Sequence, residues 1–291
     1  MLARFLARQI YLLAVGGSLV VFTVAISQGW PLGLAVTAWS VVVLGVGMAL
    51  ERARPFNPAW STDHGDTSTD ASSAVVLIAA ADPAIKALLP MLVSAWAPGV
   101  AAGAASRWTG PFVAQVAAAV LWIELAKYVS HRAHHTVPAL WWLHAMHHSS
   151  RRLYWLNNFR FHPLNHLINT SVAMLPLLAL GAPHDVLLAA LAVTQPVLML
   201  QHLNADTRNG WANHVFSTNE LHRWHHSTVP AEANSNFGSA LVLWDLVFGT
   251  YRPADAQPAQ VGLFGQGGGY PAHGSYWRQL GALFSPACCR A

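Results

Sequence analysis

Histidines with the spacing of metal ligands gather in one part of this sequence. Of the 16 histidines, 14 lie between residues 131 and 226, most of them in HRAHH at 131–135, HAMHH at 144–148, HPLNH at 162–166, QHLN at 201–204 and HRWHH at 222–226. On an α-helix, residues at i, i+3 and i+4 share a face, so histidines at these spacings can converge. Adjacent histidines diverge by about 100° around the helix axis. The doubled histidines therefore favour two nearby metal ions over one.

The predicted ligands are all nitrogen donors. Imidazole binds iron, zinc, copper and nickel well, whereas magnesium and calcium prefer oxygen. The two cysteines, Cys288 and Cys289, are adjacent and distant from the histidine groups, so a site must form without thiolate. The pattern predicts a dinuclear iron or zinc site, with these candidate ligands: His131, His135, His144, His147, His148, His202, His222, His225 and His226.

Other histidines have weaker spacing. His162 and His166 are either two further ligands or part of a turn, since Pro163 suits the first position of a helix. His134 shares HRAHH with a better-spaced pair and is expected to be a bystander. Isolated histidines are usually structural or exposed, and this interpretation applies to His64, His184, His214 and His273.

Two carboxylates are candidates to support the ligands. Ligating histidines usually donate their second N–H to a carboxylate or carbonyl. Glu124 lies two turns before His131 on the same helical face and is predicted to have this role, the alternative being an ion pair with Lys127 or Arg132. Asp245 either acts in the same way or caps a turn.

Composition places these groups in a membrane protein. The chain has 291 residues, of which 54% are hydrophobic and only 10% charged. Soluble domains carry roughly a quarter charged residues. The 13 tryptophans fit an interfacial belt. The net charge of +4 comes without any Lys/Arg run, which argues against nucleic acid binding.

Apolar segments predict a multi-pass, all-α membrane bundle. Residues 10–27 and 34–50 are long enough to span a bilayer, and the first is too long for a usual signal peptide. Residues 71–103 are apolar but broken by prolines, which predicts either one kinked helix or a re-entrant hairpin. A further helix is expected from 111 to about 128, and two short ones within 168–199. We divide the chain into a hairpin and polar loop at 1–70, a catalytic domain at 71–252 and a tail at 253–291 that is rich in Gly, Pro and Gln and expected to be loosely structured.

Arginines at the ends of the first two helices predict the orientation. Arg4 and Arg8 precede the first helix, and Arg52 and Arg54 follow the second. Positive residues favour the cytoplasmic side. An even number of crossings then leaves the histidine groups on the same side, so the predicted metal site faces the cytoplasm.

The ordered motifs resemble the fatty acid hydroxylase / sterol desaturase superfamily. HRAHH, LWWLHAMHHSS, RFHPLNH, LHRWHHS and NSNFGSALVLWDLVFGTY carry the resemblance, which covers about residues 120–252. It implies an integral-membrane, non-heme di-iron enzyme that uses O2 and electrons to hydroxylate or desaturate a lipid C–H bond. It also implies that eight histidines of the first, second and last boxes are ligands, joined by His202: His131, His135, His144, His147, His148, His222, His225 and His226. His162 and Pro163 match the family, whereas His166 stands where many members have Glu, and Glu124 where they often have Asp.

The resemblance implies two iron ions, which zinc can displace on overexpression, and a fatty acyl, sterol or related lipid from the bilayer. The chain has no Gly-rich dinucleotide motif, Cys cluster or haem signature, so electrons must come from a separate cytochrome b5-like or ferredoxin-like protein. One alternative is a zinc-dependent membrane hydrolase with Glu124 or Glu220 as general base. Another is a metal transporter or sensor, but only Asp82 and Lys86 lie within an apolar stretch.

Overall fold

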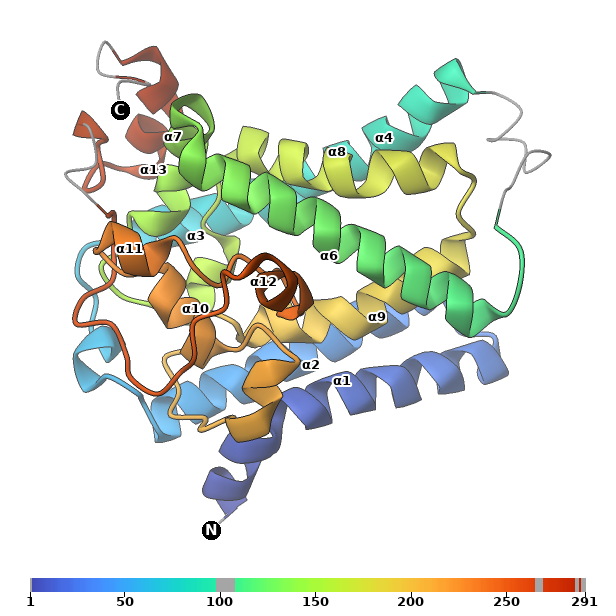
Figure 1. Cartoon of the computed structure of the whole chain (residues 1–291), viewed down its shortest axis with the longest axis horizontal. Coiled ribbons are helices and arrows are strands. Elements are labelled where there is room, and N and C mark those ends of the chain that lie inside the picture. The colour runs from blue at the N-terminus through green and yellow to red at the C-terminus, as the bar shows by residue number, and fades with distance from the viewer. Residues whose placement is uncertain (1, 98–107, 265–268, 286–287, 289–291) are drawn as a thin grey trace.

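The computed structural model describes residues 2–97, 108–264, 269–285 and 288, and its regular elements are helices (Figure 1). Within these residues, extended backbone pairs only in isolated bridges, such as Pro55 with Ala205. The all-α prediction is confirmed. The α-helices are α1 Leu2–Gln28, α2 Leu32–Ala53, α3 Thr67–Val76, α4 Asp82–Trp96, α6 Phe112–Thr136, α7 Pro138–His148, α8 Pro163–Ala179, α9 His184–Leu200, α10 Asn219–His225, α11 Pro230–Ala233, α12 Leu243–Phe248 and α13 Tyr276–Leu280.

Short turns of other helix types link them. The 3₁₀ turns are η1 Pro58–Ser61, η3 Trp155–Phe159, η4 Gly210–His214 and η6 Gly281–Phe284. A π-helical turn, η2 Leu77–Ala81, joins α3 to α4.

Four described helices are long and apolar enough to cross a membrane, namely Phe5–Gln28, Leu32–Ala53, Thr67–Trp96 and Phe112–Thr136. They include the three spanning segments predicted at 10–27, 34–50 and 111–128. The two short helices predicted within 168–199 correspond to α8 and α9.

Residues 71–96 form one helical run, interrupted by a π turn, rather than a re-entrant hairpin, and residues 98–103 of the predicted segment lie outside the described residues. The π turn separates α3 from α4, with Pro83 in the first turn of α4. Proline cannot donate a backbone hydrogen bond, so the ladder is interrupted here. Lys86 and Asp82 form an i,i+4 ion pair at 2.6 Å.

Helix α9 lies at the centre of the bundle. One face of α9 packs on α1 and α2, where Tyr11, Val43 and Leu200 belong to a shared buried cluster. Its other face packs on α6, where Ile123 and Ala190 are buried. The long helices run side by side across Figure 1, and α7, α10, α11 and α13 gather at one end of them.

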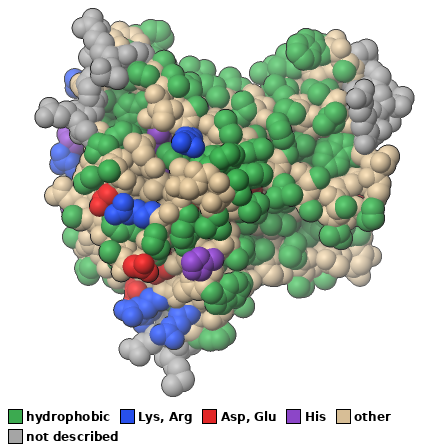
Figure 2. All heavy atoms as spheres, in the orientation of Figure 1, with side chains coloured by type: hydrophobic (Ala, Val, Ile, Leu, Met, Phe, Trp, Pro, Cys, Tyr) green, Lys and Arg blue, Asp and Glu red, His purple; other side chains and the backbone are tan. Residues whose placement is uncertain are grey.

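That same end carries the visible charge. Figure 2 shows Lys, Arg, Asp, Glu and His side chains on the left half of the molecule, while hydrophobic side chains dominate the right half. The ends of α6 and α9 therefore meet the short helices in the polar part of the protein.

Within the described part of the tail, residues 276–284 are helical. Helix α13 packs on α3 and buries Tyr276 and Gln279. The Gln279 side-chain oxygen accepts hydrogen bonds from Ser149 Oγ at 2.9 Å and Arg160 Nη2 at 3.3 Å. A few anchoring side chains thus fix a segment whose average composition resembles a linker.

Candidate metal centre

Nine buried or half-buried histidines form two neighbouring groups. In each group, one ring nitrogen from every histidine lies within 4.8 Å of the others. The first group is His131, His135, His144, His148 and His225, and the second is His147, His202, His222 and His226. These are the nine ligand candidates predicted from the sequence.

Helix geometry divides the doubled histidines between the two groups. The rings of His147 and His148 are inclined at 85°, and those of His225 and His226 at 87°. In each pair, one ring joins the first group and the other joins the second. Residues four apart, such as His222 and His226, stay in one group because they share a helix face. This division gives two centres side by side.

The ends of four helices bring the boxes together. Val137 ends α6 in an extended conformation, with φ −104° and ψ 116°, and Pro138 begins α7. An extended residue before a proline that starts a helix is the usual arrangement. His202 follows the end of α9, where Tyr11 Oη donates a hydrogen bond to Leu200 O at 3.2 Å. Helix α10 then supplies the last box.

Backbone carbonyls fix the orientation of three rings. Nδ1 of His131 lies 2.9 Å from Phe237 O, and Nδ1 of His225 lies 3.0 Å from Ser235 O. Nδ1 of His147 lies 3.1 Å from Arg160 O. A carbonyl oxygen can only accept, so each Nδ1 carries the proton and each Nε2 keeps a free lone pair.

Asparagines perform the same task for three other rings. The side-chain oxygens of Asn234, Asn165 and Asn158 lie 3.3 Å, 2.9 Å and 2.7 Å from Nδ1 of His135, His144 and His202, respectively. Each amide oxygen accepts the Nδ1 proton and again leaves Nε2 free.

His134 supports this arrangement from outside the two groups. Asn165 Nδ2 donates to His134 Nε2 at 2.9 Å, and His134 Nδ1 donates to Ser130 O at 2.7 Å. This chain of hydrogen bonds fixes the amide that orients His144. His134 is therefore not a ligand candidate, and its role is to hold Asn165 in place.

The separations between Nε2 atoms fit metal binding. Nε2 of His131 lies 3.0 Å from that of His144, and Nε2 of His147 lies 3.2 Å from that of His202. Two unprotonated nitrogens repel at this distance unless a cation lies between them. Adjacent ligands of an ion at about 2.1 Å are about 3.0–3.4 Å apart. Nε2 of His225 is buried without a hydrogen-bond partner, as a ligand atom would be before metal is added.

Burial keeps these rings in the form that binds metal. Desolvation lowers the pKa of His202 to about 3, and it lowers the pKa of His147 and His222 well below the ordinary value of 6.5. The same cause lowers the pKa of His144, His148, His225 and His226. Neutral imidazole is the ligating form, so the groups need no deprotonation at neutral pH.

The two carboxylates accept hydrogen bonds from backbone N–H groups and not, as predicted, from the ligand histidines. Glu124 Oε2 accepts hydrogen bonds from the backbone N–H groups of Ala240 and Leu241, each at 2.8 Å. Asp245 accepts from the N–H groups of Phe237 and Gly238, also at 2.8 Å. Within the described structure, neither carboxylate bonds to a histidine of the two groups. Both fix the segment that presents the Phe237 carbonyl to His131.

The third box contributes through its asparagine. His162 caps α8, where its Nδ1 accepts a hydrogen bond from Leu164 N at 3.1 Å. Nε2 of His166 lies 3.4 Å from Asp82 Oδ1. Both histidines lie outside the two groups, as do His64, His184, His214 and His273. Asn165, between them in HPLNH, is the residue that reaches the site.

Aromatic rings surround the histidines. Phe161 stacks on His147 with a centroid distance of 4.4 Å. Phe264, from the tail, lies 4.0 Å from Trp141 and 5.4 Å from His135. The spacing of histidines along the sequence indicates ligands but not their partners, so it did not reveal Phe264 or the three orienting asparagines. Rings in these positions limit the access of water.

Comparison with known proteins agrees with this centre. The fatty acid hydroxylase family model matches residues 116–250, which contain all nine histidines. The chain is also 37% identical over 224 residues to the ornithine lipid hydroxylase OlsE of Rhizobium tropici, covering 74% of this chain and 67% of that protein. The chain belongs to the fatty acid hydroxylase family. No solved structure matches it. The resemblance predicted from the histidine boxes is confirmed.

Proposed function

We propose that this fatty acid hydroxylase family member is a membrane-bound di-iron enzyme that hydroxylates a lipid. The observation that carries the proposal is the pair of adjacent all-histidine groups. Neighbouring Nε2 atoms are 3.0–3.2 Å apart, and carbonyl or amide oxygens hold six of the nine Nδ1 atoms. The first group offers five nitrogen donors and the second offers four, which suits two redox-active transition metals and not magnesium or calcium.

Two irons, when bound, would supply O2 activation and C–H oxidation, in the overall conversion of R–H, O2, two electrons and two protons to R–OH and water. The first group, with His131 and His225, would hold one iron. The second, with His202 and His222, would hold the other. The protein's part is to fix ring orientation through the Nδ1 hydrogen bonds and to keep water away with Phe161, Phe264 and Trp141.

The position of the centre suits a substrate from the bilayer. His131 and His135 are in the last two turns of α6, which is long and apolar enough to span a membrane. A reactive centre at the end of such a helix is near the lipid headgroups. We place it at the cytoplasmic face because Arg52 and Arg54 lie at the same end of the bundle as the histidines, following the positive-inside tendency.

Electrons would come from a separate cytoplasmic protein, cytochrome b5-like or ferredoxin-like. None of the sequence motifs that hold flavin, nicotinamide, haem or an iron–sulfur cluster occurs in the chain. The donor is therefore part of the proposed reaction and must be present in any assay.

The relative suggests the first substrate to test. OlsE is named an ornithine lipid hydroxylase, so we propose ornithine lipid or a closely related lipid, and hydroxylation in preference to desaturation. Fatty acyl chains and sterols are the substrates to test next.

The hydrolase alternative has less support. Glu220 Oε2 accepts hydrogen bonds from Asn209 N and Asn213 Nδ2, each at 3.0 Å, and Glu124 is bound to the backbone of residues 240–241. Among the described carboxylates, none lies in either histidine group, so neither proposed general base reaches the centre.

The test is incorporation of ¹⁸O from ¹⁸O2. Membranes containing the iron-loaded protein are incubated with ornithine lipid, a reductase and a donor, and the lipids are analysed by mass spectrometry. The expected product carries one ¹⁸O atom in the wild type and in the control His184→Ala, whose side chain is exposed and outside both groups. His147→Ala should abolish it. Oxygen-independent lipid cleavage by the zinc-loaded protein would contradict the proposal.

A further inference from the structure

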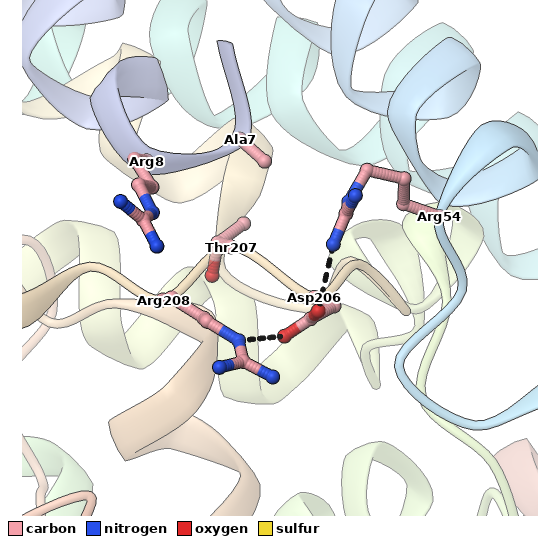
Figure 3. A pocket seen from close by; sticks show the side chains of 6 residues that line it. All are labelled: Ala7, Arg8, Arg54, Asp206, Thr207 and Arg208. Atoms are coloured by element: carbon pink, nitrogen blue, oxygen red, sulfur yellow. Dashed lines mark hydrogen bonds and ion pairs between the residues drawn. The ribbon is translucent and has the colours of Figure 1, made fainter. Parts of the chain in front are cut away.

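A polar pocket lies away from the histidines, at the N-terminal end of α1 and the C-terminal end of α2. It has a volume of about 280 Å³ and is lined by Ala7, Arg8, Arg54, Asp206, Thr207 and Arg208. Figure 3 shows Asp206 between Arg54 and Arg208, with Arg8 standing apart from this ion-paired group. Three guanidinium groups against one carboxylate leave the pocket with an excess of two positive charges. We propose that this pocket binds the phosphate of an anionic phospholipid.

The arginines are only partly neutralised. Arg54 Nη2 lies 3.0 Å from Asp206 Oδ2, and Arg208 Nε lies 3.2 Å from Asp206 Oδ1. Arg8 forms no ion pair with any residue that the structure describes. Arg54 Nε is buried and has no hydrogen-bond partner among the described residues. An unsatisfied buried donor is costly, and a phosphate oxygen is a good acceptor for it.

The backbone holds the pocket in place. Asp206 N donates to Arg54 O at 3.0 Å, which joins the loop after α9 to the end of α2. Arg208 has φ 53°, in the left-handed region that residues with a side chain seldom adopt. Residues in such backbone conformations cluster at functional sites.

Position identifies the source of the phosphate as lipid. Arg8 is one turn inside the spanning segment Phe5–Gln28, and Arg54 directly follows the segment Leu32–Ala53. Both are therefore at headgroup depth if these helices cross the bilayer. The volume is below the 300–1,000 Å³ usual for a whole ligand, so it fits a headgroup whose acyl chains remain outside. The excess positive charge favours a lipid with a net negative charge over phosphatidylcholine, whose ammonium group it repels.

Lipid retention by the full-length protein tests the proposal. Native mass spectrometry would compare bound phosphatidylglycerol with bound phosphatidylcholine of the same acyl chains. In Arg8→Gln/Arg208→Gln, phosphatidylglycerol binding should fall by about fivefold for each arginine, or about 25-fold in total. The matched control Arg151→Gln/Arg278→Gln removes two exposed arginines elsewhere and should change binding less than twofold. Asp206→Asn should strengthen binding about fivefold, by the same argument.

The other outcomes overturn the proposal. Equal losses in both double variants would mean that binding follows overall charge and not the pocket. Unchanged binding in Arg8→Gln/Arg208→Gln would exclude the pocket, provided that its unfolding temperature matches that of the wild type. If inorganic phosphate displaces the lipid and stabilises the protein as strongly, the ligand is free phosphate and the lipid assignment is wrong.

Discussion

Asn165 offers a sharp test of the two-centre arrangement, because it contacts a ligand candidate from only one group. Its side chain is fully buried and accepts from His144 at 2.9 Å while donating to His134 at 2.9 Å. Asn165→Leu keeps the branched shape of the side chain but leaves His144 Nδ1 without an acceptor. Loss of such a partner weakens metal binding by about 10–100-fold. Only the ion of the first group should be affected.

Asn158 provides the mirror variant. It orients His202 of the second group at 2.7 Å, so Asn158→Leu should weaken the other ion by about 10–100-fold. Chelator titration followed by elemental mass spectrometry would measure both affinities in each purified variant. The expected result is one ion lost at lower chelator concentration and one ion lost as in the wild type.

A matched control and a double-mutant cycle make the test decisive. Asn169→Leu alters another asparagine of α8, which bonds to Ser130 at 2.6 Å and to no histidine of the groups, and should leave both affinities unchanged. The effect of Asn165→Leu should disappear in a His131→Ala background and persist in His202→Ala. If Asn165→Leu weakens both ions equally in a folded protein, or weakens neither, the assignment of separate groups is refuted.

Three further predictions concern stability and access. Asp245→Asn should lower the free energy of unfolding by about 1–3 kcal/mol, because an amide cannot accept both backbone N–H bonds, whereas the exposed Asp255→Asn should not. The pKa of His202 is lowered by burial to about 3, so the unfolded state binds more protons below pH 6.5. As pH falls below 6.5, the free energy of unfolding of the metal-free protein should therefore decrease by up to about 1.4 kcal/mol per pH unit for each such histidine. Phe264→Ala should speed iron release to a chelator about tenfold, by opening the apolar cover of the centre, and the exposed Trp277→Ala should not.

Denaturant titrations at about pH 7.5 and 5.5 measure the first two effects, and stopped-flow chelation measures the third. A metal-free protein whose stability is constant between these pH values would contradict the burial of neutral histidines. Equal iron release from Phe264→Ala and wild type would show that the tail does not cover the centre.

The histidine spacing predicts two neighbouring metal ions and eight of the nine histidines in the two groups. Helix periodicity alone separates His147 from His148 and His225 from His226, and the same rule joins His131 to His135. His202 was harder, since it stands alone in the sequence, and only its position after an apolar helix and the family resemblance indicated it. The helical class and most helix bounds followed from the apolar runs and prolines.

The orienting residues could not be predicted in this way. Asn158, Asn165 and Asn234 reach histidines 44, 21 and 99 residues away in sequence, and nothing in local spacing records such a contact. A carboxylate was expected for this role, but Glu124 is bound to the backbone of a neighbouring segment. Phe264 could not be predicted as a contact of the site, because the Gly-rich sequence around it indicates a loop without fixed contacts.

The most direct test of the central claim is the iron content of full-length protein from iron-57-grown cells, measured by elemental analysis and Mössbauer spectroscopy. The histidine groups predict about two irons per folded chain, behaving as a magnetically coupled pair. A well-folded protein that binds no iron after iron-replete growth, or that binds a single uncoupled ion, would contradict the di-iron proposal.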